Sequence, residues 1–457
     1  MPHQLSQLGP SLAVGDVDDN GFDDVYIGGA AGQSGALYLQ SSDKKFSKAS
    51  TNTWSQDAKH EDVEALFFDA DGDEDLDLYV VSGSYEFRTG SEILQDRLYI
   101  NSKGNFKKST NALPKIVSSG GALAAADYDN DGDQDLFVGG RLLSGQYPYA
   151  PESYFLINDN GQFKNMTSAE LSKVGMVTDA VWSDYDKDGD SDLIVVGEWM
   201  DIHFFDNVNG KLESNSSLIN NEQVGWWNCI KAQDLDGDGD DDYVLGNLGD
   251  NYKYKASTEQ PFEIFGGDLD QNGSRDIVVG YYSEGTLFPV RGLQCSSEQM
   301  PSLKKKFGTY ESFGNADVFK VYGAALDDAL HYKANTFKSI ILWNEGGTMK
   351  TQELPPLAQM APIQDIIIHD FDKDSDLDLL VAGNWYVSEV ETPRADAGTG
   401  LLLTNDGNNQ FKAESVTESG FFANKDVRNM ALIKSKSGSP LILVANNNDK
   451  VQMFETN

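Results

Sequence analysis

The sequence predicts an all-β protein, a β-propeller of eight blades with a short helical insertion, and seven blades are the alternative. An acidic loop of nine residues recurs seven times along the 457 residues. Each copy lies between two short apolar segments, which is the pattern of a β-hairpin. The first five copies begin at nearly regular intervals, at residues 16, 69, 127, 184 and 234. A repeated hairpin at this spacing is typical of blades stacked around a ring.

The clearest loop runs from Asp184 to Asp192 and reads Asp-Tyr-Asp-Lys-Asp-Gly-Asp-Ser-Asp. Carboxylates at the first, third, fifth and ninth positions form a ring of hard oxygen ligands, which suits Ca²⁺ better than softer metals. We therefore expect up to seven calcium sites. Their ligands would be Asp16, Asp18, Asn20 and Asp24; Asp69, Asp71, Asp73 and Asp77; Asp127, Asp129, Asp131 and Asp135; Asp184, Asp186, Asp188 and Asp192; Asp234, Asp236, Asp238 and Asp242; Asp268, Asp270, Asn272 and Asp276; and Asp370, Asp372, Asp374 and Asp378.

Two loops depart from the pattern at the sixth position. Most copies have Gly there, whereas the second loop has Glu74 and the seventh has Ser375. A sharp turn with positive φ costs little only for glycine. The sites that begin at Asp69 and Asp370 are therefore expected to be weaker or differently shaped.

Four short strands are expected in each complete repeat. In the first two repeats they are residues 12–15, 25–27, 36–39 and 45–46, and then 65–68, 78–81, 97–100 and 105–106. The third and fourth repeats add the outer strand pairs 154–157 with 161–163 and 202–205 with 210–212. Four strands are the content of one propeller blade.

The later repeats are less regular. The sixth loop follows the fifth so closely that the blade between them must be trimmed, with 252–254 as its only expected outer strand. Residues 291–335 lose the strand pattern and are expected to form a helical insertion, with Pro301 near a helix start. An eighth unit keeps the strands 430–433, 441–444 and 451–454, but its turn at 434–438 has no carboxylate and should bind no metal.

We expect residues 1–457 to form a single propeller closed by both termini. The last unit ends before a fourth strand, and residues 3–8 precede the first strand of the chain. The N-terminal segment could supply the missing outer strand, and closure of this kind removes exposed sheet edges.

The composition excludes several classes of partner. A formal net charge of −38 and a pI near 4.3 argue against nucleic acids and anionic membrane surfaces, which would repel the protein. The sequence contains no run of 18 or more apolar residues, so no segment is expected to span a membrane as a helix. Whether Cys229 and Cys295 pair or remain free thiols is open.

The calcium loops suit the millimolar calcium outside cells, so an extracellular or cell-surface location is expected. The first residues, Met-Pro-His-Gln, carry no signal peptide. We therefore expect a mature fragment or the tail of a longer secreted protein, and a cytosolic location is the alternative.

No motif of an enzyme is apparent. The five histidines are scattered, and no zinc-protease, nucleophile-elbow or phosphate-loop pattern is present. Calcium binding accounts for the paired carboxylates. Trp226-Trp227 and Tyr147-Pro148-Tyr149 could stack on sugar rings, although packing is the more common role of such side chains.

Lys304, Lys305 and Lys306 form the only triple-basic run of this acidic chain, and they lie in the expected insertion. Insertions in repeat proteins lie in loops on one face, often the binding face. The lysines could bind a partner, or the insertion could plug or buttress the ring while the lysines pair with carboxylates.

With its loops and flanking strands, the chain resembles the FG-GAP/VCBS family of calcium-binding β-propeller repeats, which also form the head of integrin α-subunits. Four stretches resemble the C-terminal part of large secreted or surface proteins of Bacteroidota: 197–200, 246–249, 291–301 and 391–394. The resemblance implies extracellular interaction or carbohydrate-linked roles and no common catalytic residues.

Three functions are compatible with these features. The first is a non-catalytic, calcium-stabilised scaffold that binds protein or glycan partners through one face and the insertion. The alternative is a polysaccharide lyase or hydrolase on an eight-bladed calcium propeller. The third is an architectural module of a larger surface complex.

Overall fold

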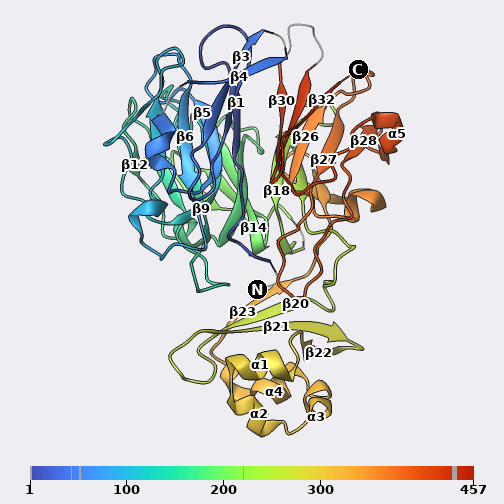
Figure 1. Cartoon of the computed structure of the whole chain (residues 1–457). Helices are drawn as coiled ribbons and strands as arrows, with labels where there is room; N and C mark the ends of the chain where they lie inside the picture. The colour runs from blue at the N-terminus through green and yellow to red at the C-terminus, as the bar shows by residue number, and fades with distance from the viewer. Residues whose placement is uncertain (1–2, 43, 51–52, 220, 435–439, 457) are drawn as a thin grey trace.

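The computed structural model describes residues 3–42, 44–50, 53–219, 221–434 and 440–456. Its strands form eight antiparallel sheets, as the eight hairpins predict. Seven of these sheets stand around a common axis, and the eighth lies below them beside a group of short helices (Figure 1).

The strands of the ring run outward in order within each blade. Blades one to four contain β1 (Leu12–Gly15), β2 (Asp24–Ile27), β3 (Ala36–Ser42) and β4 (Lys45–Lys48); β5 (Asp62–Phe68), β6 (Asp77–Ser82), β7 (Arg97–Ile100) and β8 (Lys107–Lys108); β9 (Ser119–Ala126), β10 (Asp135–Leu142), β11 (Tyr154–Ile157) and β12 (Lys164–Asn165); and β13 (Met176–Ser183), β14 (Asp192–Met200), β15 (His203–Asn207) and β16 (Leu212–Ser214), with β17 (Gly225–Trp226) paired to β14. Blades five to seven contain β18 (Cys229–Gln233), β19 (Asp242–Gly246), β24 (Ile340–Asn344) and β25 (Met349–Glu353); β26 (Asp365–His369), β27 (Asp378–Ala382), β28 (Leu401–Asn405) and β29 (Phe411–Ala413); and β30 (Val427–Ile433), β31 (Leu441–Asn446) and β32 (Gln452–Glu455). The short helices outside the insertion are η1 (Thr53–Asp57), η2 (Glu92–Leu94), η3 (Leu171–Lys173), η5 (Pro356–Gln359) and α5 (Val416–Ser419).

The ring closes through its inner strands. The strands β1, β5, β9, β13, β18, β26 and β30 contact one another in this order, and β30 contacts β1. A separate hydrophobic cluster fills the space between each pair of neighbouring blades, including the pair formed by the last blade and the first. The strands can bury both faces because each blade is covered on both sides, which explains runs such as β10 and β14 that are buried along their whole length.

The eighth sheet belongs to an insertion between β19 and β24 of blade five. It consists of β20 (Phe262–Gly267), β21 (Asp276–Ser283), β22 (Thr286–Pro289) and β23 (Leu330–Ala334). The expected helices follow β22 as α1 (Leu293–Gln299), α2 (Ser302–Lys306), α3 (Tyr310–Gly314), α4 (Val318–Tyr322) and η4 (Gly323–Leu326). The ring thus has the seven blades of the alternative, and the sixth acidic loop lies in the inserted sheet.

Two expectations about chain connectivity need correction. The expected outer strand at 252–254 is wrong, because Tyr252 and Tyr254 are buried in an aromatic cluster and blade five takes its outer strands from beyond the insertion. Among the described residues, the N-terminal segment also adds no strand to the last blade. His3 instead forms an isolated bridge with Ser388, and the ring closes by side-chain packing between β30 and β1.

The order of the strands places the acidic loops and the insertion on opposite faces. In each blade the first connection joins strand one to strand two at one end of the strands. The second connection joins strand two to strand three at the opposite end, and so lies on the opposite face of the ring. The insertion is such a second connection, in blade five. The six acidic loops of the ring therefore lie on the face away from the insertion (Figure 1).

Cys229 is buried and Cys295 is half-buried, and both are free thiols. None of the described helices is long and apolar enough to span a membrane.

Candidate metal centres in the acidic loops

The seven acidic loops share one backbone conformation. In each loop the N–H of the sixth residue donates to the carboxylate of the first Asp, over 2.7 Å in the loop of Asp16 and up to 3.2 Å in that of Asp370. The side-chain oxygen of the fifth residue accepts from the N–H two residues later. These bonds wrap the backbone around the acidic side chains.

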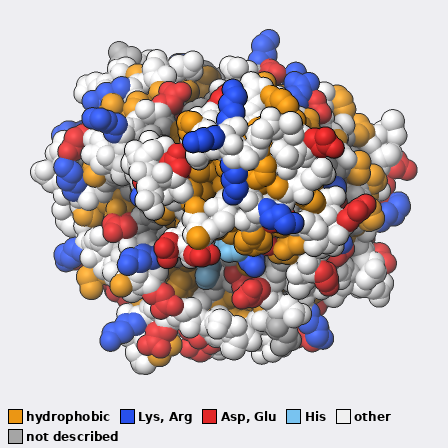
Figure 2. Space-filling model, turned by 90° about the horizontal axis from the view of Figure 1, so that it is seen from below, with side chains coloured by type: hydrophobic (Ala, Val, Ile, Leu, Met, Phe, Trp, Pro, Cys, Tyr) orange, Lys and Arg blue, Asp and Glu red, His pale blue; other side chains and the backbone are white. Residues whose placement is uncertain are grey.

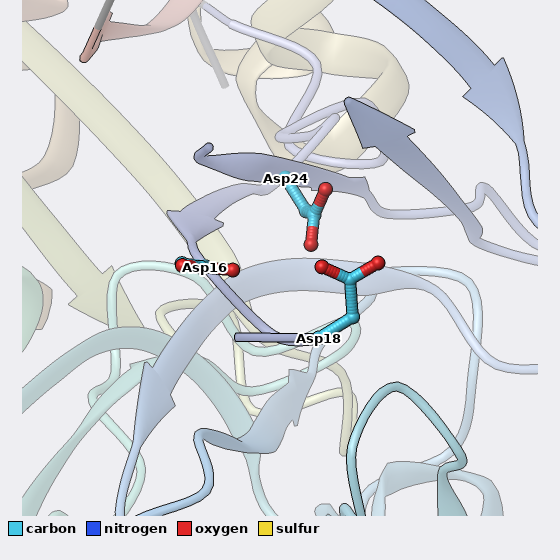
Figure 3. A group of neighbouring side chains, drawn as sticks. All are labelled: Asp16, Asp18 and Asp24. Carbon is cyan, nitrogen blue, oxygen red and sulfur yellow. The ribbon is translucent and has the colours of Figure 1, made fainter. Parts of the chain in front are cut away.

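The fold brings the predicted ligands together. The carboxylate oxygens of Asp16, Asp18 and Asp24 lie within 4.8 Å of one another and point to a common space (Figure 3). The first, third and ninth residues of the loops that begin at Asp69, Asp184 and Asp234 form equivalent groups. In the third loop the residues within this distance are Asp127, Asp129 and Asp131. Groups of this kind could hold a metal ion.

Several carboxylate oxygens of the acidic loops lack a hydrogen-bond partner. Oδ1 of Asp18, Asp71 and Asp270, at the third position of their loops, is buried and accepts no hydrogen bond. The same holds for Oδ2 of Asp192, at a ninth position. A buried acceptor without a partner is costly, and a cation between the carboxylates would remove that cost. These unpaired oxygens fit a hard cation.

Burial and crowding raise the pKa of carboxylates at the third and ninth positions of several loops. Burial, followed by the neighbouring Asp16, raises the pKa of Asp18. At the ninth position burial raises the pKa of Asp24 to about 6 and that of Asp242 to about 7. A divalent cation would stabilise the ionised forms, so binding must release protons.

The Asp at the ninth position also joins the loop to its blade. In blade three, Oδ2 of Asp135 accepts from the N–H of Tyr128 in the same loop at 3.2 Å, and Oδ1 accepts from the N–H of Asn158 in the turn after the third strand at 2.7 Å. The other blades that carry an acidic loop repeat the bond to the third strand. The remaining lone pairs can still coordinate a cation.

The two loops without glycine at position six keep the backbone conformation of the other acidic loops. Glu74 has a φ of 69° and Ser375 a φ of 82°, whereas Gly189 has 96° at the same position. Both therefore adopt the left-handed conformation that glycine adopts easily and other residues adopt at a cost. The expectation of a different shape is wrong for these two loops, and that of weaker binding stays a prediction.

A set of buried asparagines escaped the sequence reasoning. Nδ2 of Asn101 donates to the carbonyl of Val17 at 2.8 Å, and Nδ2 of Asn158 donates to the carbonyl of Ala70 at 2.9 Å. Asn207 and Asn344 repeat this bond to Tyr128 and Tyr185. In each case the asparagine follows the third strand of one blade, and the carbonyl belongs to the acidic loop of the preceding blade.

These asparagines link the acidic loops of blades one to four to the next blade, so those loops form part of the contact between blades. The signal was present in the sequence. Each of the four is followed three residues later by a glycine, and these glycines, Gly104, Gly161, Gly210 and Gly347, all have positive φ.

The other candidate residues have structural surroundings. Trp226, Trp227 and Tyr147 are buried, which confirms packing for them. Nζ of Lys306 donates to the carbonyls of Lys320 and Val321 at 2.8 and 2.9 Å, at the end of α4. Lys304 and Lys305 are exposed on α2. In the metal-free turn expected at 434–438, only Lys434 lies within the described residues.

The chain is similar to several solved structures. A solved structure of an Agrocybe aegerita lectin, described by its specific recognition of non-reducing terminal N-acetylglucosamine, is 13% identical over 98% of this chain and 86% of its own, with a TM-score of 0.47. The Dos1 propeller is 10% identical over 99% and 94%, with a TM-score of 0.43. The Vibrio cholerae biofilm matrix protein Bap1 is 11% identical over 100% and 88%, with a TM-score of 0.41. No curated protein matches the sequence.

A comparison with protein families matches two segments of the ring. Residues 69–138 and 184–245 match the FG-GAP-like repeat. Each matched segment begins at the first Asp of an acidic loop and runs through the next loop into the strand after it. These two segments of the chain are therefore similar to the FG-GAP-like repeat.

Proposed function

We propose that the protein is a non-catalytic, calcium-stabilised propeller outside the cell that presents a binding surface to protein or glycan partners. The observation that carries this proposal is the recurrence of one loop geometry in six blades and in the inserted sheet, with carboxylates clustered in the loops of blades one to five. Calcium is the cation of choice because the ligands are all oxygens and the site is open enough for additional water ligands.

Calcium would act by holding the blades together. Each acidic loop joins the first two strands of its blade, and four loops also accept a bond from an asparagine of the next blade. A cation that orders the loop would therefore order the contact between two blades. A ligand that binds only the folded state stabilises that state by mass action.

The proposed binding surface is the helical part of the insertion. Tyr310 and Phe319 are 69% and 57% exposed there, and Lys304 and Lys305 are exposed on the neighbouring helix. In the view from the insertion side, Lys and Arg side chains gather in the upper half with hydrophobic side chains between them (Figure 2). Exposed aromatic and basic side chains together favour a partner that carries negative charge.

Calcium titration of the metal-free protein tests the stabilising role. We expect calcium at millimolar concentration to raise the melting temperature and EDTA to lower it, while magnesium has a smaller effect because it demands a stricter octahedral geometry. An unchanged melting curve in EDTA would refute the calcium scaffold. Elemental analysis after gel filtration gives the number of bound ions independently.

The double substitution of Lys304 and Lys305 to Ala tests the binding surface, with Lys211→Ala as a change of an exposed lysine before β16, away from the insertion. The double variant should lose retention on an acidic glycan or on an acidic protein partner and keep its calcium response. Unchanged retention would favour a purely structural insertion.

A further inference from the structure

The axis of the ring contains a cavity of about 290 Å³ with charged walls. Glu64 of β5, Asp179 of β13, Lys231 of β18 and Asp365 of β26 all line it, so the charges come from four different blades. None of these residues belongs to an acidic loop. The cavity is thus separate from the candidate metal centres.

Negative charge is in excess among the residues that line the cavity. Arg141 and Arg428 also lie in the wall, but each has its own carboxylate, Glu198 at 2.5 Å and Asp426 at 3.1 Å. Lys231 then remains as the one cation for three carboxylates, and its Nζ lies 3.2 Å from Oδ1 of Asp365. Glu64 and Asp179 are thus in excess over the cations of the described wall. Burial raises the pKa of Glu64 to about 8 and also raises the pKa of Asp179, so an added cation would stabilise the ionised forms of both.

The two carboxylates differ in how they are held. Asp179 accepts from the N–H groups of Ala180 and Ile230, both at 2.9 Å, and so bridges two inner strands. Glu64 accepts through Oε1 from the N–H of Ala65 at 3.0 Å, and no partner is recorded for its Oε2. Glu64 is therefore a deeply placed carboxylate with a free oxygen beside an open space.

The rest of the wall is largely polar, and its aliphatic part includes four side chains. Leu12, Leu66, Leu123 and Met430 contribute aliphatic wall. Toward the insertion, Trp385 lines the cavity and His3 stacks on it with ring centroids 4.3 Å apart. Nε2 of His3 lies 2.9 Å from the hydroxyl of Tyr252 in the insertion, which holds His3 in this position.

We propose that the axial cavity binds a small aliphatic diamine, with its ammonium groups at Glu64 and Asp179 and its alkyl chain against the leucines. Two positive charges match the two uncompensated carboxylates, and a short methylene chain matches the aliphatic wall. A single metal ion fits less well, because the cavity is many times larger than one water-sized site.

Isothermal titration calorimetry with 1,4-diaminobutane tests the proposal. The protein is kept in millimolar CaCl₂ and 0.15 M NaCl, so that the acidic loops are saturated and general attraction to the acidic surface is screened. We expect one saturable site, no binding of 1,4-butanediol, and weaker binding of butylamine. Absence of diamine binding to the folded protein would overturn the proposal.

Three variants locate the site. Glu64→Gln keeps the bond from Ala65 and should weaken diamine binding by about 10- to 100-fold, the effect of losing one hydrogen bond to a charged group. Lys231→Met removes the competing ammonium and should strengthen binding. Glu213→Gln, on the exposed outer strand β16, should change nothing. Equal weakening by Glu64→Gln and Glu213→Gln would mean surface attraction and refute the axial site, and melting curves verify that each variant is folded.

Discussion

Replacing Asn158 with Ala should destabilise the ring at the contact between blades two and three. Asn158 is 1% exposed, and its amide satisfies two buried backbone groups, the carbonyl of Ala70 and the N–H of Gly161, each at 2.9 Å. Alanine leaves both groups without a partner. Buried groups left unpaired cost about 1–3 kcal/mol each, so we expect a loss of about 2–6 kcal/mol in the free energy of unfolding.

For a chain of this length the loss corresponds to a decrease of roughly 2–6 °C in melting temperature, because the unfolding entropy is about 1 kcal/mol/K. The assay is differential scanning calorimetry in EDTA and in calcium. The rise in melting temperature on adding calcium should also be smaller than in the wild type, because Ala70 directly follows the first ligand of the second loop.

The matched control is Asn165→Ala, which removes an exposed asparagine from the outer strand of the same blade. It should melt within experimental error of the wild type. If Asn158→Ala melted like this control, the asparagine bonds would not contribute to the contact between blades, and the proposed link between loop and ring would be refuted.

Three further predictions concern backbone strain, pH and the insertion. Glu74→Gly should stabilise the protein by about 1 kcal/mol, because a left-handed residue with a Cβ costs roughly 1–2 kcal/mol. Asp75→Gly, at a position without positive φ, should not stabilise it. Equal effects of the two substitutions in urea unfolding would contradict the strain argument. Burial raises the pKa of Asp96 to about 7, so the folded state binds more protons than the unfolded state between pH 4 and 7. In EDTA the free energy of unfolding should therefore fall as pH rises through this range, and Asp96→Asn should flatten the fall; an unchanged slope would exclude Asp96 as its source. Lys306→Ala should make the insertion more sensitive to limited proteolysis, because it removes two hydrogen bonds to the end of α4. Lys304→Ala should not. Similar digestion of both variants would contradict a stabilising role of these hydrogen bonds.

Local chemistry made the candidate sites predictable. Alternating carboxylates with glycine at the sixth position specify a tight loop from within nine residues, and the structure brings Asp16, Asp18 and Asp24 together as that pattern requires. The hairpins on either side were predictable for the same reason, since apolar segments flank every loop. The helices of the insertion were predictable because the alternation typical of strands is lost there.

The sequence by itself determined the number of hairpins, the acidic loops and the all-β class, because each depends on residues that are close together in the chain. Only the tertiary structure decided which hairpins join the ring. The outer strands of blade five follow an insertion of more than ninety residues (between Gly246 and Ile340), so no local signal connects them to β19. The axial cavity was also beyond prediction, because Glu64, Asp179, Lys231 and Asp365 meet only when the inner strands of different blades surround one axis.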